Sequence, residues 1–298
     1  MQPFELTFKT KELTLILLTV VPSREAAERL TRAINVHVAK DTFPLRSDII
    51  EQCIRDAGGW LQNQYNVAAY REWNKGSKAA IVMSYHQGLL HDPSGLIPAE
   101  QMFDNDGSVA ARRRYQNGRL HDSEYGAAEE VFTSDGKLSK RSRYQHGQLH
   151  DGPNGEPAAV SFNNDGSIYS QSRYQQGQLH DGPNREPAHE WFHPDTGKIF
   201  LRERYLYGMR SCNLRGPAQG PAVEKYYEDG TLACVERYSA GRRHNTLDAD
   251  GLFSVPAIEK YGRDGTLVET VHYNGEPRSA AGPTKPPAAR PRGRHYRA

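Results

Sequence analysis

The sequence predicts a mainly β protein, an array of about six β-hairpin repeats that forms an extended sheet or solenoid. A small α+β domain precedes the array and a disordered tail follows it. Two observations support this prediction. An aromatic residue recurs ahead of an Asp-Gly pair with nearly constant spacing, and Asp-Gly between short apolar runs is a strong hairpin signal. The flanking segments, residues 1–84 and 277–298, lack the repeat.

Two strands are expected first, over the apolar runs 4–8 and 13–21, and the second run follows Lys9 and Lys11. A signal peptide would also place an apolar run after basic residues. However, Glu5 and Glu12 lie in or beside this basic region, and no small-residue cleavage site follows the run. The run is short and β-branched, which indicates a buried strand. We expect no membrane insertion, because no apolar run approaches the roughly 20 residues that span a bilayer.

Two helices are expected next. Ser23 can cap a helix over residues 24–36, which has apolar residues on one face. A second helix fits residues 48–57, with Ser47 as its cap and Gly58 at its stop. Residues 1–84 therefore read as a small α+β domain, or as a cap that covers the apolar end of the repeat array.

The repeat itself is defined by four positions. A Pro-Ala pair (Ala-Ala in the second repeat) is followed by an aromatic residue, an aspartate with a nearby glycine, and a closing tyrosine. The aromatic residues are Phe103, Phe132, Phe162, Phe192, Tyr226 and Tyr261. The closing tyrosines are Tyr115, Tyr144, Tyr174, Tyr205, Tyr238 and Tyr273. Length varies mainly between a tyrosine and the next repeat, as expected of a loop, so the part of nearly fixed length is predicted to be the hairpin.

Side-chain alternation selects the turn. In the third repeat, a two-residue loop would place Phe162 and Ile168 on opposite faces of the hairpin. A three-residue loop at 164–166 pairs them on one face, together with Tyr174. We therefore predict the three-residue loop, which requires Gly166 in the left-handed region that glycine adopts without steric cost.

The connecting segments carry a Leu-His-Asp motif. A periodic motif does not suit catalysis, which needs one assembled site. We favour a structural role in which the aspartate accepts backbone N–H groups in a turn and the histidine packs against a neighbour. The alternative is a recognition ladder that faces a partner. Its candidate partner-binding residues are His91, Asp92, His121, Asp122, His150, Asp151, His180 and Asp181.

Residues 85–275 resemble the MORN-repeat variant of bacterial and phage proteins, some of which are described as antitoxin-like. The resemblance rests on aromatic-x-x-Asp-Gly, Tyr-x-x-Gly-x-Leu-His-Asp and Gly-x-Pro-Ala. It implies a β-hairpin array that acts as an interaction or scaffolding surface. The repeat here is close to 30 residues long and lacks the Gly-x-Gly core of ordinary MORN units, so lipid-headgroup binding does not carry over.

Charge separates the three parts of the chain. Residues 1–84 hold 11 basic and 9 acidic side chains, residues 85–276 hold 21 and 27, and the tail holds 6 and 0. The mildly acidic array is not expected to bind nucleic acid. The proline-rich tail has nothing to bury and is expected to be disordered. Its candidate phosphate or nucleic-acid contacts are Arg290, Arg292, Arg294 and Arg297.

Other polar motifs receive structural interpretations. Residues 104–107 (Asp-Asn-Asp-Gly) resemble the start of a calcium loop, but the downstream glutamate is missing and a hairpin turn explains the same residues. The arginines that precede or accompany the closing tyrosines are expected on a solvated face; they are Arg112, Arg113, Arg114, Arg143 and Arg173. Three scattered cysteines suggest free thiols in a reducing compartment. We expect no catalytic, cofactor-binding or metal-binding residues.

The leading functional prediction is a non-enzymatic protein-interaction or scaffolding protein in the cytoplasm. It would have a protein partner and would contact nucleic acid only through the tail. The resemblance implies an antitoxin-like protein or a phage or bacterial inhibitor, and the oligomeric state is left open. The alternative is a toxin or effector whose activity or nucleic-acid binding resides in residues 1–84, with the repeats serving delivery or neutralisation. Its candidate polar residues are Glu25, Glu28, Arg32, His37 and Asp41.

Overall fold

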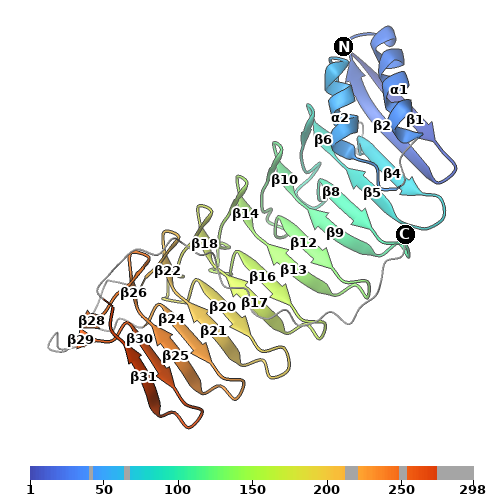
Figure 1. Ribbon diagram of the computed structural model, residues 1–298. Coiled ribbons are helices and arrows are strands. Elements are labelled where there is room, and N and C mark those ends of the chain that lie inside the picture. Colours follow the sequence, from blue (N-terminus) through green and yellow to red (C-terminus); the bar gives the residue numbers. More distant parts are fainter. Residues whose placement is uncertain (40–42, 64–67, 212–220, 248–253, 274–298) are drawn as a thin grey trace. The chain divides into compact units, whose positions relative to one another are not determined.

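The computed structural model describes residues 1–39, 43–63, 68–211, 221–247 and 254–273 of the 298-residue chain. It is mainly β, with two helices among the described residues (Figure 1). The chain divides into two compact units, residues 1–166 and 167–298. The expected disordered tail, 277–298, lies outside the described residues. The domain boundary expected after residue 84 stays a prediction, and strand pairing continues across it from β5 to β8.

The first unit begins with the elements that precede the predicted repeats. They are β1 (Gln2–Lys9), β2 (Leu13–Val21), α1 (Arg24–Val38), α2 (Ser47–Asp56), β3 (Trp60–Leu61), β4 (Tyr70–Asn74) and β5 (Ala80–Met83). The predicted strand over residues 13–21 and both predicted helices are confirmed. The Ser23 hydroxyl accepts the Ala26 N–H at the start of α1. The second cap is wrong by one residue, because α2 begins at Ser47 and Arg46 takes the cap position.

The remaining strands of the first unit form long hairpins that alternate with short hairpins, whose strands have only two residues each. These strands are β6 (Tyr85–His86), β7 (Leu89–Leu90), β8 (Glu100–Phe103), β9 (Val109–Arg113), β10 (Tyr115–Gln116), β11 (Arg119–Leu120), β12 (Glu129–Phe132), β13 (Leu138–Ser142), β14 (Tyr144–Gln145), β15 (Gln148–Leu149) and β16 (Ala159–Phe162). The long strands pair antiparallel in the order β1-β2-β4-β5-β8-β9-β12-β13-β16.

The second unit repeats the same alternation. Its strands are β17 (Ile168–Ser172), β18 (Tyr174–Gln175), β19 (Gln178–Leu179), β20 (His189–Phe192), β21 (Ile199–Glu203), β22 (Tyr205–Leu206), β23 (Met209–Arg210), β24 (Val223–Tyr226), β25 (Leu232–Glu236), β26 (Tyr238–Ser239), β27 (Arg242–Arg243), β28 (Thr246–Leu247), β29 (Ser254–Val255), β30 (Ile258–Tyr261) and β31 (Leu267–Val271). The long strands pair antiparallel in the order β17-β20-β21-β24-β25-β30-β31.

The predicted hairpin turn is confirmed. Phe103 lies opposite Val109 with a bulge. The Gly107 N–H donates to the Asp104 carbonyl, and the Asp104 N–H donates to the Ser108 carbonyl, which leaves a three-residue loop. Gly166, the glycine on which the prediction depended, has φ +89°. The turn therefore sets the register in which the aromatic and aliphatic positions pair.

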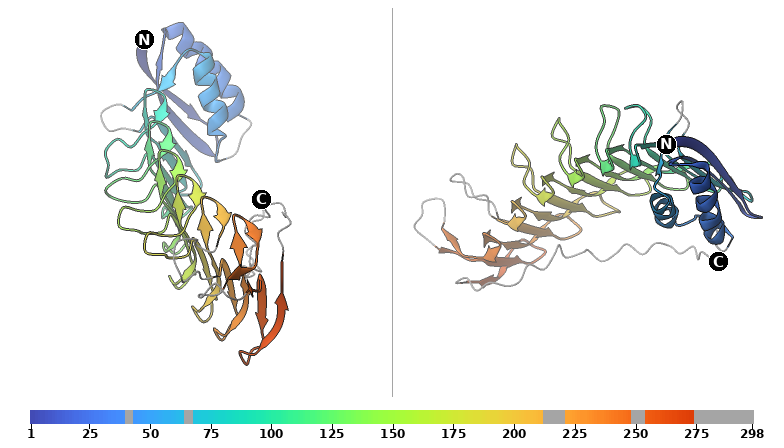
Figure 2. Two further views of the ribbon diagram at one scale, coloured as in Figure 1. Left: turned by 90° about the vertical axis from the view of Figure 1, so that its left-hand side faces the viewer. Right: turned by 90° about the horizontal axis from the view of Figure 1, so that it is seen from above.

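The buried core of the first unit lies between the helices and the first strands. Leu15 and Leu17 of β2 and Tyr70 of β4 pack with Leu30 of α1 and Ile54 of α2 in one buried cluster. Both helices lie against the same face of these strands (Figure 2). No side chain of β8 to β16 belongs to this cluster. Cross-strand side-chain pairs therefore carry more of the stabilisation in these later hairpins than a central core does.

The structure also contains a long hairpin that the sequence analysis missed. β4 and β5 pair antiparallel, with Trp73 opposite Ala80. Trp73 precedes Phe103 by 30 residues, and Tyr85 precedes Tyr115 by the same number. Residues 68–85 therefore form a hairpin of the repeat type, although this segment has no Asp-Gly pair.

Candidate functional site

The aspartates of the Leu-His-Asp motif clamp the open ends of the long hairpins. The Asp92 Oδ1 atom accepts the N–H of Ala99, which precedes β8, at 2.8 Å and that of Tyr115, which follows β9, at 2.9 Å. Asp122 accepts the corresponding amides of Ala128 and Tyr144 at 2.8 and 2.9 Å. In the second unit, Asp181 accepts those of Ala188 and Tyr205. The Ala158 N–H donates to Asp151 at 3.0 Å.

Two asparagines occupy the same position in repeats that lack the motif. The Asn63 Oδ1 atom accepts the N–H groups of Ala69 and Tyr85, each at 2.9 Å. The Asn245 Oδ1 atom accepts those of Ala257 and Tyr273 at 3.1 and 2.9 Å. An amide oxygen thus serves as well as a carboxylate oxygen, so the two backbone bonds, rather than the negative charge, define this position.

The second carboxylate oxygen faces the arginine that precedes the closing tyrosine. Arg143 lies 3.1 Å from Asp122 Oδ2, and Arg204 lies 3.2 Å from Asp181 Oδ2. The expectation that Arg114, Arg143 and Arg173 lie on a solvated face is wrong. Arg114 and Arg173 are buried, and the Arg143 side chain is only 15% exposed. Burial makes these charges costly unless they are paired, and the motif aspartates supply partners for Arg143 and Arg204.

The motif histidines are held in two different ways. The Nδ1 atoms of His91 and His121 accept backbone N–H groups of the next short hairpin, at 3.2 and 3.1 Å. Their outer Nε2 atom therefore carries the proton in the neutral ring. The Nδ1 atoms of His150 and His180 lie 2.8 and 2.7 Å from the carbonyl oxygens of the following aspartates, so they donate and leave Nε2 as an acceptor.

The orientation of these rings bears on metal binding. A metal ion can bind Nε2 only if this atom has a free lone pair. At His91 and His121 the backbone N–H at Nδ1 favours the tautomer with the proton on Nε2, which disfavours metal binding there. His121 packs against His146, with ring centroids 4.8 Å apart. Burial, with a smaller contribution from His146, lowers the pKa of His121. Among the described residues, no group of three or more His, Cys, Asp or Glu side chains could hold a metal ion.

The calcium-like residues 104–107 form the hairpin loop. The Asp106 Oδ1 atom accepts both the backbone N–H of Ser108 at 2.8 Å and its hydroxyl at 2.7 Å. Thus Asp106 acts locally as a turn residue. The hydroxyl and backbone N–H of Ser108 lower the pKa of Asp106.

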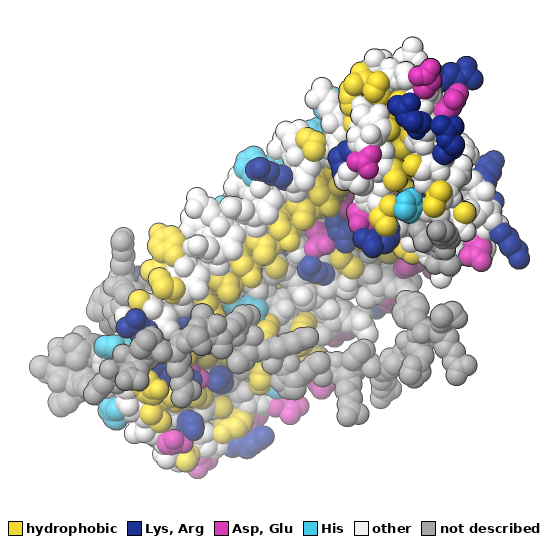
Figure 3. Space-filling view, turned by 45° about the horizontal axis from the view of Figure 1, so that its top comes forward, with side chains coloured by type: hydrophobic (Ala, Val, Ile, Leu, Met, Phe, Trp, Pro, Cys, Tyr) yellow, Lys and Arg dark blue, Asp and Glu magenta, His cyan; other side chains and the backbone are white. Residues whose placement is uncertain are grey.

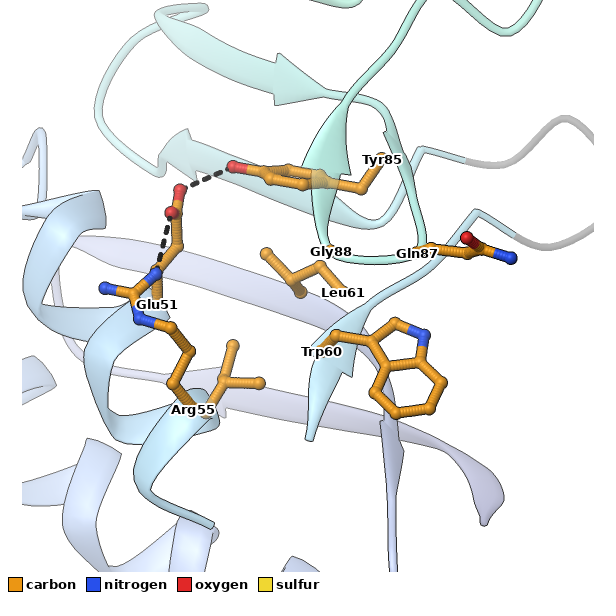
Figure 4. Close-up of a pocket in the computed structure, with 8 residues that line it drawn as sticks. Glu51, Arg55, Trp60, Leu61, Tyr85, Gln87 and Gly88 are labelled. Carbon is orange, nitrogen blue, oxygen red and sulfur yellow. Dashed lines mark hydrogen bonds and ion pairs between the residues drawn. The ribbon is translucent and has the colours of Figure 1, made fainter. Parts of the chain in front are cut away.

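A shallow hollow of about 190 Å³ lies between α2, β3 and the first short hairpin (Figure 4). Trp60 and Leu61 form part of its wall, and Glu51 and Arg55 reach it from α2. The Tyr85 hydroxyl donates to Glu51 at 2.6 Å. Burial and the Glu51 carboxylate raise the pKa of Tyr85, which favours the protonated phenol that donates this hydrogen bond.

The polar candidates of α1 do not converge on this hollow. Glu25, Glu28 and Arg32 are exposed, and Glu28 pairs with Arg24 at 3.5 Å. Charged side chains of both signs lie close together on the outer surface of the helices (Figure 3). Asp41 and the four tail arginines, Arg290, Arg292, Arg294 and Arg297, lie outside the described residues. Neither described helix is long and apolar enough to cross a membrane.

The sequence analysis missed a buried charge network in the second unit. Arg210 lies 2.6 Å from the Oε1 atom of Glu203, whose side chain is 1% exposed. In the next repeat, Arg243 lies 2.9 Å from Glu236, and Lys225 approaches the same carboxylate at 2.8 Å. Burial raises the pKa of Glu203. Burial also acts to raise the pKa of Glu236, but the hydrogen bond from Lys225 and the nearby positive charges outweigh it and lower the pKa of Glu236 to about 2.

This network has a signal in the sequence. The spacing from Glu203 to Arg210 equals that from Glu236 to Arg243, and both pairs flank a closing tyrosine. In the two preceding repeats, the corresponding residues are serine and leucine. The joint change of both positions indicates that they touch.

We compared the chain with protein-family models and with curated protein sequences. The chain matches no protein-family model and no curated protein sequence.

Proposed function

We propose that the protein is a non-enzymatic interaction or scaffolding protein that binds a protein partner through its β-hairpin repeats. One observation supports this most directly. In the sequence, the motif aspartates resemble catalytic or metal-binding residues. In the structure, they accept the backbone N–H groups of the residues that precede and follow the long hairpins. Rows of side chains on the sheet then remain as the surface available to a partner. An antitoxin-like role in a bacterial or phage cytoplasm is the narrower form of this proposal, and it rests on the MORN-variant resemblance.

The test is affinity purification of the full-length tagged chain from its own host, at low and then at higher salt. Two single variants locate the contact, Arg141→Glu on the repeat sheet and Arg29→Glu on α1, where Arg29 is exposed. The proposal expects a protein partner that survives higher salt, is lost with Arg141→Glu or with another substitution on the repeat sheet, and is retained by Arg29→Glu. Nucleic acid as the only bound material, or a partner unaffected by substitutions across the repeats, contradicts it.

The rival proposal of a toxin or effector gains its support from the hollow beside Glu51 and Tyr85. In this case the phenotype of the expressed chain depends on residues 1–84. Glu51→Gln should then abolish the phenotype while the melting temperature and partner binding stay unchanged. Arg46→Gln, at an exposed Asp48 ion pair outside the hollow, is the control, and it should keep the phenotype.

A further inference from the structure

The first unit carries a straight row of side chains on the face opposite its helices. Tyr70 and Glu72 of β4 point into the buried side, so Arg71 between them points to the other face. Each member of the row lies directly opposite the next on the neighbouring strand. From β4 to β16, the row reads Arg71, Val82, Gln101, Arg112, Glu130, Arg141 and Val160.

The row has an excess of positive charge, with three guanidinium groups and one carboxylate. Arg71 is paired with Glu5 at 3.4 Å, in an exposed contact. None of the ion pairs found among the described residues involves Arg112 or Arg141. Arg112 lies over the Phe132 ring at 5.3 Å, and Arg141 lies over the Phe162 ring at 6.0 Å. The Nε atoms of Arg71 and Arg141 are buried, so an oxygen acceptor would meet the terminal Nη groups of these side chains.

Aromatic rings border the row of arginines. Trp73 is 37% exposed and follows Arg71 by two residues, which places both on one face. Phe103 lies opposite Ala80, which in turn lies opposite Trp73. The stacking contacts bring Phe132 and Phe162 to the same side. Apolar area therefore lies beside the guanidinium groups of Arg112 and Arg141 along one surface, in a combination typical of protein-binding surfaces.

We propose that this arginine–aromatic face binds an extended acidic segment of a partner protein, a proposal that rests on the proposed interaction function. Strands lie about 4.8 Å apart, so Arg112 and Arg141 are roughly 10 Å apart and Arg71 and Arg112 roughly 14 Å apart. A peptide in the extended polyproline II conformation advances about 3.1 Å per residue and presents every third residue on the same side. The arrangement fits Asp or Glu at every third residue, each received by one guanidinium, with apolar residues between them on the rings.

Charge favours a short acidic peptide over nucleic acid. Residues 85–276 hold 27 acidic against 21 basic side chains, so the array as a whole repels a long polyanion. A segment with three or four carboxylates meets only the local excess of arginine. At physiological salt, screening limits the interaction between exposed charges to about 8 Å, so the peptide interacts mainly with the local row.

The opposite face supplies a matched control. Arg113 and Lys140 are the sequence neighbours of Arg112 and Arg141, and alternation places them on the other face. There they pair with Glu129, at 3.1 and 2.8 Å. The variants Arg112→Gln/Arg141→Gln and Arg113→Gln/Lys140→Gln therefore remove equal charge from adjacent positions on opposite faces.

The experiment measures fluorescence anisotropy of a labelled 14-residue peptide with the full-length protein at physiological salt. The peptide has glutamate at every third position and phenylalanine or serine between. We expect Arg112→Gln/Arg141→Gln to weaken binding at least tenfold and Arg113→Gln/Lys140→Gln to change it less than threefold. Equal weakening by both variants, or no effect of the first, overturns the proposal. Tighter binding of a 14-nucleotide thymidine strand than of the peptide also overturns it.

Folding and the broader function are controlled separately. If thermal unfolding shows that the Arg113 variant is destabilised, the comparison is made between the single variants Arg141→Gln and Lys140→Gln, with the same expected contrast. If the partner found by affinity purification still binds Arg112→Gln/Arg141→Gln and is lost with other substitutions on the repeats, the acidic-segment proposal fails while the interaction function stands.

Discussion

Asn63 and Asp92 make the same pair of bonds in consecutive repeats. Each side-chain oxygen accepts the N–H of an alanine before a long hairpin and that of the tyrosine after it, at 2.8–2.9 Å. The hairpin before Tyr85 and the one before Tyr115 are thus closed in the same way, one by an amide and one by a carboxylate.

This equivalence predicts how Asp122 responds to substitution. Asp122→Asn keeps the oxygen that accepts the Ala128 and Tyr144 amides. We expect a loss of about 1 kcal/mol from the weakened contact with Arg143, because Arg143 keeps Glu156 as a second partner at 3.5 Å. Asp122→Ala leaves both amides without an acceptor and should cost about 2–3 kcal/mol. Urea unfolding of the two variants tests this, and equal losses would show that the charge is what matters.

The buried pair Glu203–Arg210 offers a double-mutant cycle set by the protein's own repeats. Arg210→Leu leaves a carboxylate that is 1% exposed without its 2.6 Å partner, and we expect a loss of about 3–5 kcal/mol. Glu203→Ser/Arg210→Leu recreates the serine and leucine of the preceding repeats and should recover most of that loss. Chemical unfolding of wild type, both single variants and the double variant gives the coupling energy, and additive losses contradict the prediction.

Local residue patterns predicted the long hairpins, because turn chemistry and side-chain alternation act over a few residues. Phe162, Ile168 and Gly166 were sufficient to select the three-residue loop. The hairpin around Trp73 was missed because it replaces Asp-Gly with Gly76-Ser77, and the side chains of Asn74 and Ser77 accept backbone N–H groups in its turn instead. The clamp formed by Asn63 was also missed, because its partner Tyr85 is 22 residues away and no local rule connects them.

The short hairpins were missed for a related reason. Their turns place two consecutive residues at positive φ, as in Asn117 at +51° and Gly118 at +75°, which is the hairpin turn that Asn-Gly favours. Gln176, Tyr207 and Ala240 hold the first position in other repeats at φ +51°, +49° and +46°. In these repeats only the glycine at the second position remained, and a single glycine is too weak a signal to predict a hairpin turn.

The same geometry predicts a stabilising substitution. Ala240 is exposed and has φ +46°, a conformation that costs an L-residue about 1 kcal/mol and that asparagine tolerates better. Ala240→Asn should raise the free energy of unfolding by about 0.5–1 kcal/mol, and Asn117→Ala should lower it by a similar amount. Melting temperatures that move in the same direction for both variants would rule out the turn as the cause.

His189 predicts an acid-sensitive second unit. Burial, with a smaller contribution from Arg210, lowers the pKa of His189 from 6.5 to about 4. Its Nδ1 atom lies within hydrogen-bonding distance of the Ser172 hydroxyl. Because the folded state binds this proton less readily than the unfolded state, the stabilisation is fully present above pH 6.5 and is lost as the pH falls towards 4. The shift corresponds to about 3 kcal/mol. His189→Gln removes the titration, so the difference in unfolding free energy between wild type and variant should shrink by up to that amount between pH 7 and pH 4. A difference that stays constant over this range would show that His189 does not titrate in the way its burial predicts.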